Sequence, residues 1–304
     1  MTKTPIPAPT VTVLEVIEQM ADRLDAAGLS FADGYGQGTT NAFDEAAWLV
    51  LWKLGLEIDD LESVENRPVA PEDQAQVALL VDQRISTRQP AAYLTNEAWL
   101  MGVPFYVDER VIIPRSLIAE LLDDGSIDDW LSDETLRVLD LCTGNGSLAV
   151  LAAMAYPEVV VDAADISRDA LDVARINVER HQLGSRITLV ESDGLAACPG
   201  PYDLILCNPP YVNAASMAAL PAEFRAEPGL ALSGNIHGGS DGMDFIRGLF
   251  LAIAAQMNEN AVLVLEIGNE RENFVRAFPH LEPLWFETSA GPDQVLLLTR
   301  EQLA

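Results

Sequence analysis

A hydrophobic run stops at an asparagine, two prolines and a tyrosine in the stretch LILCNPPYVN, residues 204–213. Such a run predicts a buried strand, whose end the prolines hold rigid. There the Asn208 side-chain oxygen and the Pro209 carbonyl can accept both N–H hydrogens of a flat amide or amino group. Tyr211, beyond Pro210, can stack on that group and exclude water. This favours reaction at a nitrogen whose growing positive charge the acceptors stabilise; the alternative is a proline-capped turn without chemistry.

A glycine-rich turn follows another predicted strand in DLCTGNGSLA, residues 140–149. Gly144 and Gly146 stand between strand and helix, where the backbone can approach a ligand closely. Read as G-x-G-x-x-A, the turn also matches the dinucleotide-binding fingerprint. Asp165, at the end of the next predicted strand, stands where a carboxylate can hold ribose hydroxyls. NAD and S-adenosylmethionine both use this geometry, so the turn and Asp165 leave the choice between them open.

Two further carboxylates favour S-adenosylmethionine. Asp140 precedes the glycines, where it would face a cationic sulfonium ligand rather than a pyrophosphate. Asp193 ends the third predicted strand and could bind an exocyclic amine such as that of adenine. Each aspartate alone could equally be a turn or helix-cap residue, but three at successive strand ends make a purely structural explanation of all three unfavourable. Methyl transfer requires an in-line approach of the nucleophile to the methyl group, and Asn208 could orient such a nucleophile.

Strands and helices alternate from residue 137 onward, and these elements must position the motifs. The alternation predicts an α/β fold with a doubly wound, mainly parallel sheet, in which ligands bind at the carboxyl ends of the strands. The predicted strands are 137–141, 159–165, 187–192, 203–207 and 261–268, closed by an antiparallel pair near 285–288 and 294–299, with helices ending near 156 and spanning about 169–181.

The first 90 residues instead show helical spacing of apolar residues, over 11–28, over 41–56 and between Pro71 and Pro90. They predict a small helical domain, with a mobile loop at the glycine-rich stretch 34–38. The alternative is a helical lid with no chemistry of its own.

Residues 91–115 contain clustered aromatic and β-branched residues around MGVP, which predicts a β-hairpin. We therefore expect a helical domain over 1–90, a hairpin linker over 91–115 and the catalytic α/β domain over 116–304.

The formal net charge of −29 is spread along the chain, with −11 over residues 1–110 and −18 over 111–304. Such a surface repels phosphate backbones, so direct recognition of nucleic acid is disfavoured. It would accelerate encounter with a basic protein partner. Adaptation to high salt is the alternative, because only two lysines, Lys3 and Lys53, accompany the many acids.

Three cysteines, Cys142, Cys198 and Cys207, are unclustered and lack metal-site spacing, which favours reduced thiols in the cytoplasm and no bound metal. The apolar runs are too short to span a bilayer, and the first ten residues lack the apolar region of a secretory signal. We expect no membrane association.

The combination of DLCTGNG and NPPY resembles the class I S-adenosylmethionine-dependent methyltransferases that modify a nitrogen of a planar amide or base. The protein-glutamine methyltransferases are the most similar group. Within it, residues 93–122 resemble the enzymes that methylate a glutamine of large-subunit ribosomal protein L-three. The sister enzymes, which act on the GGQ glutamine of peptide release factors, typically read HLTG and IPRPDT there, where this chain has YLTN (93–96) and IPRS (113–116).

The resemblance implies S-adenosylmethionine as cofactor and S-adenosylhomocysteine as product. It implies the basic L-three protein, or the assembling large ribosomal subunit, as partner, with release factors as the alternative and methylation of a base nitrogen less favoured. Separately, we expect the helical domain over 1–90 to recognise the substrate. Loop 233–242 is a few residues longer than usual for the family, which puts substrate contacts by this loop in doubt.

Residue roles follow from the same resemblance. Catalysis and amide binding fall to Asn208 through Tyr211, with Arg115 and the loop at Glu227 and Pro228 shaping the peptide entrance. The implied cofactor contacts are Asp140, Thr143, Gly144, Asn145, Gly146, Asp165, Asp193, Gly194 and Asn208.

Overall fold

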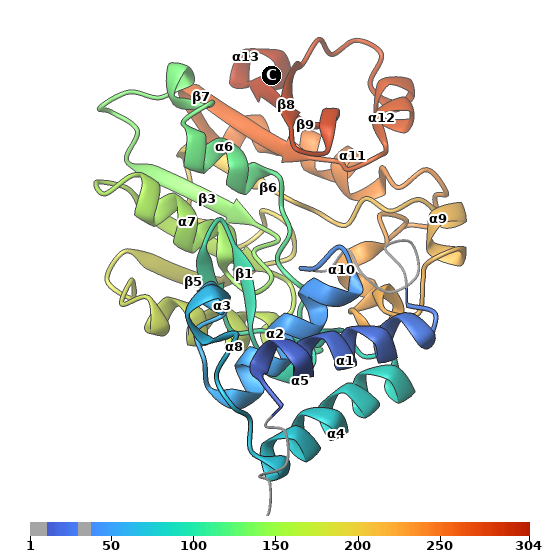
Figure 1. Cartoon of the computed structure of the whole chain (residues 1–304). Helices are drawn as coiled ribbons and strands as arrows, with labels where there is room; N and C mark the ends of the chain where they lie inside the picture. The colour runs from blue at the N-terminus through green and yellow to red at the C-terminus, as the bar shows by residue number, and fades with distance from the viewer. Residues whose placement is uncertain (1–10, 30–37) are drawn as a thin grey trace, which may run out of the picture. The chain divides into compact units, whose positions relative to one another are not determined.

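The computed structural model describes residues 11–29 and 38–304 (Figure 1). Two compact units make up the chain, one of residues 1–96 with 221–226 and one of 97–220 with 227–304. The expected mobile loop at 34–38 lies, apart from Gly38, outside the described residues, as do the first ten residues. Within the described ranges, no helix combines the length and apolarity needed to cross a membrane.

The first unit is helical, and local signals set its helix ends. Thr12 and Glu15 form a capping box at the start of the first helix, and Asn41 accepts a hydrogen bond from the backbone of Asp44 at the start of the second. The three helices predicted from apolar spacing are confirmed. The helices are α1 (Val13–Ala26), α2 (Ala42–Leu54), α3 (Leu61–Val64), α4 (Pro71–Thr87) and α5 (Ala91–Thr95), together with the 3₁₀ turn η2 (Phe224–Ala226).

A buried arginine in the first unit joins the short segment 221–226 to the helices. Arg84, on α4, donates to Glu45 Oε1 at 2.7 Å and to Glu223 Oε1 at 3.2 Å. The side chains of Arg84 and Glu223 are fully buried, and that of Glu45 is 4% exposed. Arg88 also donates to Glu223, at 2.6 Å. Charged groups therefore hold together residues that are 139 positions apart in the sequence.

The second unit contains a seven-stranded sheet of order β5-β4-β3-β6-β7-β9-β8, flanked by helices, as predicted. The first five strands in this order are parallel, and β9 and β8 close the sheet in antiparallel fashion. The strands are β3 (Arg137–Leu141), β4 (Val160–Asp165), β5 (Ile187–Glu191), β6 (Tyr202–Cys207), β7 (Met257–Glu266), β8 (Leu284–Thr288) and β9 (Gly291–Thr299). The other elements are α6 (Ile118–Asp124), η1 (Asp128–Trp130), α7 (Ser147–Ala155), α8 (Arg168–Arg180), α9 (Ala214–Ala218), α10 (Gly229–Leu232), α11 (Asp244–Phe250), η3 (Ile253–Gln256), α12 (Arg271–Ala277) and α13 (Arg300–Leu303).

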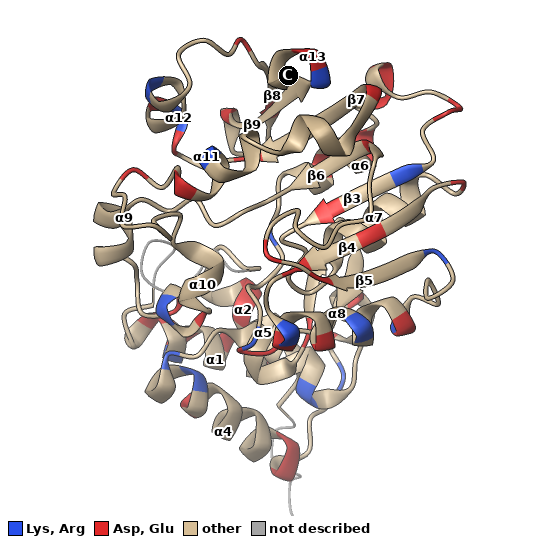
Figure 2. Ribbon diagram, turned by 180° about the vertical axis from the view of Figure 1, so that it is seen from behind, with Lys and Arg blue, Asp and Glu red and all other residues tan. Residues whose placement is uncertain are grey.

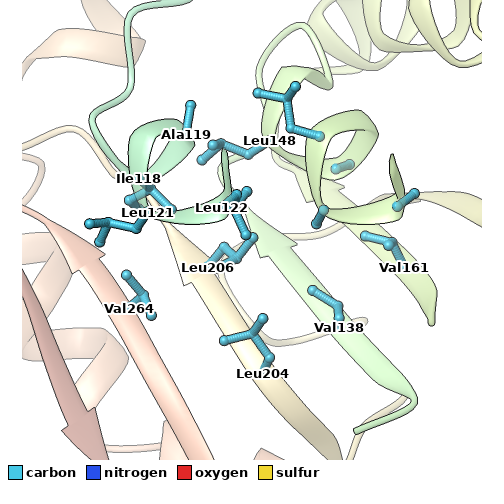
Figure 3. Close-up of a cluster of buried hydrophobic side chains, with 14 of the residues drawn as sticks. Ile118, Ala119, Leu121, Leu122, Val138, Leu148, Val161, Leu204, Leu206 and Val264 are labelled. Carbon is cyan, nitrogen blue, oxygen red and sulfur yellow. The ribbon is translucent and has the colours of Figure 1, made fainter. Parts of the chain in front are cut away.

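Alternate residues of the central strands face opposite layers of helices, as the two-residue period of a strand requires. On one face, Val138, Leu204, Leu206 and Val264 pack with side chains of α6 and α7 (Figure 3). On the other face, their strand neighbours, such as Leu139 and Ile205, pack with α11 and α12. Apolar side chains on both faces explain why these strands read as continuous hydrophobic runs.

The strand order reverses between β3 and β6. The chain proceeds from β3 to β4 and β5 on one side, then returns to β6 on the other side of β3. Leu141 and Cys207, the last residues of β3 and β6, are partners in the parallel register. The glycine turn and the Asn208 segment therefore leave neighbouring strand ends, at the crevice where open α/β sheets bind ligands.

The hairpin predicted within 91–115 occupies only part of that range. Strands β1 (Ala98–Leu100) and β2 (Val103–Phe105) pair antiparallel. Residues Ala91–Thr95 instead form the helical turn α5 and belong to the first unit. A five-residue helix and a strand contain similar apolar clusters, so the aromatic signal alone did not separate them.

Candidate active site

The glycine turn after β3 uses left-handed backbone at alternate residues. Cys142, Gly144 and Gly146 have φ of 64°, 54° and 82°. A Cβ on Gly146 would lie 3.2 Å from the Cβ of Ala174, so this glycine allows α8 to pack against the turn. A Cβ on Gly144 would meet no atom within 4 Å. Gly144 instead lines a cavity, so its missing side chain leaves room for a ligand.

Asp140 lies buried beneath this turn, with 1% of its surface exposed. Its Oδ2 atom accepts hydrogen bonds from the Thr143 hydroxyl at 2.5 Å and from the Ala149 backbone at 2.9 Å. Among the described residues, its Oδ1 atom has no partner, and neither has the buried Nδ2 atom of Asn145. One acceptor and one donor thus remain unsatisfied, and the amino acid moiety of S-adenosylmethionine, with an ammonium and a carboxylate, matches both. The residues of the turn therefore fit this cofactor.

Asp165, at the end of β4, has a structural role beside any ligand role. Its Oδ2 accepts from the Gly144 backbone at 2.9 Å, and its Oδ1 accepts from the Ser167 backbone at 2.8 Å. Burial raises the pKa of this carboxyl group, against the lowering effect of these backbone donors. Asp165 lines the same cavity as Gly144. The turn role and the expected ribose contact are therefore compatible, because each carboxylate oxygen has a second lone pair.

The cavity, of about 310 Å³, brings seven of the predicted residues together, namely Gly144, Asp165, Asp193, Gly194, Asn208, Pro210 and Pro228. Asp193 is exposed and lies two residues beyond the end of β5, not within it. The other predicted residues do not line the cavity, namely Asp140, Thr143, Asn145, Gly146, Pro209, Tyr211, Arg115 and Glu227. Their expected contacts with cofactor or substrate stay predictions.

Tyr211 lies away from the cavity lining. Its hydroxyl donates to Glu266 Oε1 at 3.3 Å, and its ring covers Gly268, where a Cβ would approach the ring carbon Cε2 to 2.6 Å. Burial, and then the charge of Glu266, raise the pKa of its phenol. The expected stacking of Tyr211 on a flat substrate group stays a prediction.

Arg115 and Glu227, both expected to shape the peptide entrance, bind each other. Arg115 donates to the two carboxylate oxygens of Glu227 at 2.5 and 2.8 Å, a bidentate arrangement. The carboxylate also accepts from the Ile113 backbone at 3.1 Å. The pair thus joins the IPRS segment to the chain next to Pro228, which lines the cavity.

Sequence reasoning missed several lining residues and one buried connector. The fully buried Asn177, on α8, binds the backbone of Tyr106 in both directions, at 2.7 and 3.0 Å, and donates to the Asn145 carbonyl at 2.8 Å. No local pattern marks such a residue. The missed lining residues include Arg110, Val111, Ile112, Leu230, Ala231, Ile236, His237 and Phe245.

Two of these lining residues, Ile236 and His237, belong to loop 233–242, whose substrate contacts the sequence left in doubt. Backbone and side-chain bonds hold the loop: Asp244 Oδ2 accepts from His237 and Gly239, both at 2.9 Å. Over the described parts of the chain, no group of three or more His, Cys, Asp or Glu side chains is arranged to hold a metal ion.

Cofactor affinity should rise with pH because of Asp140. Burial raises the pKa of its carboxyl group to about 7, against the lowering effect of Thr143 and Ala149. Above that pH the carboxylate is charged and attracts a cationic ligand; below it the group is neutral. We expect the Kd for S-adenosylmethionine, measured by calorimetry, to increase on going from pH 8 to pH 6, by up to about tenfold per pH unit.

Asp140→Asn is the control for this titration, because any pH dependence it retains belongs to the ligand or to other groups. The same Kd slope in the variant and the wild type would contradict the prediction. The stability of the protein without cofactor should have the opposite pH dependence. The folded protein retains the Asp140 proton between pH 3.8 and about 7, whereas the unfolded chain loses it. The contribution of this group to the free energy of unfolding therefore falls as pH rises through that window.

Alanine at the two glycines of the turn should separate binding from stability. Gly144→Ala places a Cβ in open space beside the cavity, so we expect at least about tenfold weaker cofactor binding and a modest cost, about 1–2 kcal/mol, from left-handed strain. Gly146→Ala adds contact with Ala174 to the same strain and should unfold at lower temperature. Calorimetry measures the Kd for the cofactor, and thermal melting measures the stability, of both variants. Equal melting temperatures of the two variants would contradict the prediction.

The fold and the site define a class I, Rossmann-like S-adenosylmethionine-dependent methyltransferase. Residues 120–228 match the family model described as methyltransferase small domain. The chain is 50% identical over 295 residues to the ribosomal protein uL3 glutamine methyltransferase of Bordetella pertussis, covering 96% of each chain. It is 47% identical to the enzyme of that name from Burkholderia pseudomallei, covering 98% of this chain and 97% of the relative, and 44% identical to that of Neisseria gonorrhoeae, covering 96% and 95%.

These identities extend over nearly the whole length of each relative. The chain belongs to the family of ribosomal protein uL3 glutamine methyltransferases.

Proposed function

We propose that this protein transfers a methyl group from S-adenosylmethionine to the side-chain amide nitrogen of a glutamine in ribosomal protein uL3, the L-three protein of the large subunit. One observation carries the proposal. The Leu141–Cys207 register sets the glycine turn beside the Asn208 segment, and Gly144 and Asn208 line one cavity. A donor held by the turn and an acceptor held by the segment would meet there.

In the proposed reaction the cofactor would supply the methyl group, and Asn208 and Pro209 would orient the amide that accepts it. S-adenosylmethionine, when bound, supplies a methyl group on a cationic sulfur, so that an N–C bond forms as the S–C bond breaks and S-adenosylhomocysteine remains. Asn208 Oδ1 and the Pro209 carbonyl would accept both N–H groups of the glutamine amide. They would thereby orient its nitrogen and stabilise the positive charge on it until one proton passes to water.

The cofactor would be held by the turn and the neighbouring strand ends. Asp140 and Asn145 would satisfy the ammonium and carboxylate groups, Asp165 the ribose, and Asp193 with Gly194 the adenine side. Gly146 supports this arrangement indirectly, because its missing side chain allows α8 to pack against the turn.

We also propose that Arg115, through its ion pair with Glu227, shapes the peptide entrance. Action in the cytoplasm, on free uL3 or on an assembling particle, is part of the same proposal.

The experiment is transfer of labelled methyl from S-adenosylmethionine to purified uL3 and to a peptide release factor, side by side. Mass spectrometry then locates the methyl group, and uL3 with that glutamine replaced by glutamate serves as the matched control. Label on one glutamine of uL3, absent from the control, is the expected result. Label mainly on the release factor would overturn the choice of substrate, and label on neither would overturn the proposed reaction.

Acidic steering of a basic substrate would make the reaction depend on salt. Asp and Glu are distributed over elements of both units (Figure 2), and the net charge is −29. Because the Debye length falls from about 10 Å at 0.1 M to about 3 Å at 1 M salt, we expect kcat/KM for uL3 to fall about tenfold or more over that range, with kcat little changed. Rates that hold or rise at 1 M would favour salt adaptation instead.

A further inference from the structure

The segment EIGNE, residues 266–270, begins at Glu266, the last residue of β7, and contains two buried carboxylates with no role so far. Glu266 is 3% exposed and Glu270 is 6% exposed. Buried carboxylates are costly unless they are hydrogen-bonded. Their partners therefore indicate which part of the chain these two groups serve.

The two carboxylates bind Tyr211 and Asn213, which follow shortly after Asn208-Pro209-Pro210. Glu266 Oε1 accepts from the Tyr211 hydroxyl at 3.3 Å. Glu270 Oε1 accepts from the Asn213 side chain at 2.6 Å and from its backbone at 3.4 Å. Between them, Gly268 lies so close under the Tyr211 ring that there is no space for a Cβ. Five consecutive residues thus hold the Asn208 segment at three points.

Glu266 also reaches in the other direction, toward the IPRS segment. Its Oε2 atom accepts from the Ser116 hydroxyl at 2.6 Å and from the Leu117 backbone at 2.9 Å. Ser116 follows Arg115, which binds Glu227. One buried carboxylate therefore links the amide-binding segment with the expected peptide entrance, and these contacts fix the side chain from both sides.

We propose that Glu266 is a positioning residue: through Tyr211 it sets the orientation of the Asn208-Pro209 acceptors, and Gly268 and Glu270 complete this clamp. The inference rests on the proposed function. Two acceptors can hold an amide in line with a methyl group only if their backbone is fixed to within about 0.5 Å, and a shift of about 1 Å can cost about 100-fold in rate. The Tyr211 hydroxyl would then act by anchoring the ring, not by touching the substrate.

The test is a double-mutant cycle of Glu266→Gln and Tyr211→Phe, with kcat on uL3, calorimetric Kd for S-adenosylmethionine and thermal melting measured for each protein. Tyr211→Phe keeps the ring for stacking and removes only the hydroxyl. We expect each single variant to lose about 10-fold or more in kcat with nearly unchanged Kd, and the double variant to be no slower than the slower single one. Wild-type kcat in Tyr211→Phe, or losses that multiply in the double variant, would overturn the proposal.

Asp203→Asn is the matched control. Asp203 accepts from the backbone of Leu136 and Arg137 at 2.9 and 2.8 Å, but near the start of β6, at the opposite end of the sheet. The Asp203→Asn substitution should lower the melting temperature and leave kcat unchanged. A loss of kcat equal to that of Glu266→Gln would overturn the specific role of Glu266.

Two outcomes need separate readouts. If Glu266→Gln does not fold, the single variants Glu270→Gln and Tyr211→Phe are measured in its place. Wild-type kcat in both of these single variants would overturn the clamp. If the wild type methylates neither uL3 nor a release factor, the proposed function fails by itself. The clamp is then judged by the melting cycle without cofactor, in which additive effects of the two substitutions overturn it.

Discussion

We expect replacement of Asn208 with alanine to lower kcat for methyl transfer to the glutamine by about 10²–10³-fold, the effect of removing one preorganised group that stabilises charge in a transition state. The Asn208 side chain follows β6, lines the cavity and would accept one N–H of the amide. Without it the nitrogen loses one of two orienting contacts, whereas the glycine turn and Asp165 are untouched. Cofactor affinity should therefore stay close to that of the wild type. Single-turnover kinetics and calorimetry measure the two quantities separately.

The control for Asn208→Ala is Asn258→Ala. Asn258 is a half-buried asparagine on β7 that binds Asp203 near the start of β6, away from the cavity. It should cost stability without changing kcat. A loss of cofactor binding in Asn208→Ala equal to its loss of rate would contradict the amide-binding role, because it would assign Asn208 to the cofactor alone.

Replacing Arg84 with methionine should destabilise the first unit by about 3–5 kcal/mol, the usual cost of removing one partner of a buried ion pair. Methionine occupies similar space, but it leaves Glu45 buried without its cation. Glu223 loses its ion pair with Arg84 and keeps the one with Arg88. Burial already raises the pKa of Glu45 against the lowering effect of Arg84, so loss of the arginine should drive this carboxyl to take up a proton. Urea unfolding, followed by Trp48 and Trp52 fluorescence, measures the loss.

Two variants test this explanation. Arg23→Met removes a salt bridge to Asp82 between side chains that are 36% and 57% exposed, and should cost less than about 1 kcal/mol. The triple variant Glu45→Leu, Arg84→Met, Glu223→Leu removes all three buried charges and should recover much of the stability. A triple variant less stable than Arg84→Met would show that geometry, and not an uncompensated charge, caused the loss.

The sequence by itself determined the elements and the two motifs that they carry. Apolar periodicity defined the three main helices, because a side chain about every 3.6 residues faces the core. Continuous apolar runs defined the central strands, which are buried on both faces, and both signals are local. Gly144 and Asn208 were recognisable for the same reason: left-handed turns and proline-stiffened strand ends have short-range signatures. From the alternation of strands and helices, the parallel sheet and its ligand-binding edge followed.

Only the tertiary structure decided what surrounds and supports that edge. Glu266 and Tyr211 are 55 residues apart, Asn177 and Tyr106 are 71 apart, and Arg84 and Glu223 are 139 apart. Each is a single polar residue in otherwise ordinary sequence, and its meaning depends on a partner brought near by folding. Burial makes these contacts strong, because an unpaired polar group in the core is costly, yet burial has no local signature for a lone polar residue. Short motifs therefore predicted the chemistry. The residues that hold those motifs in place could not be predicted from the sequence.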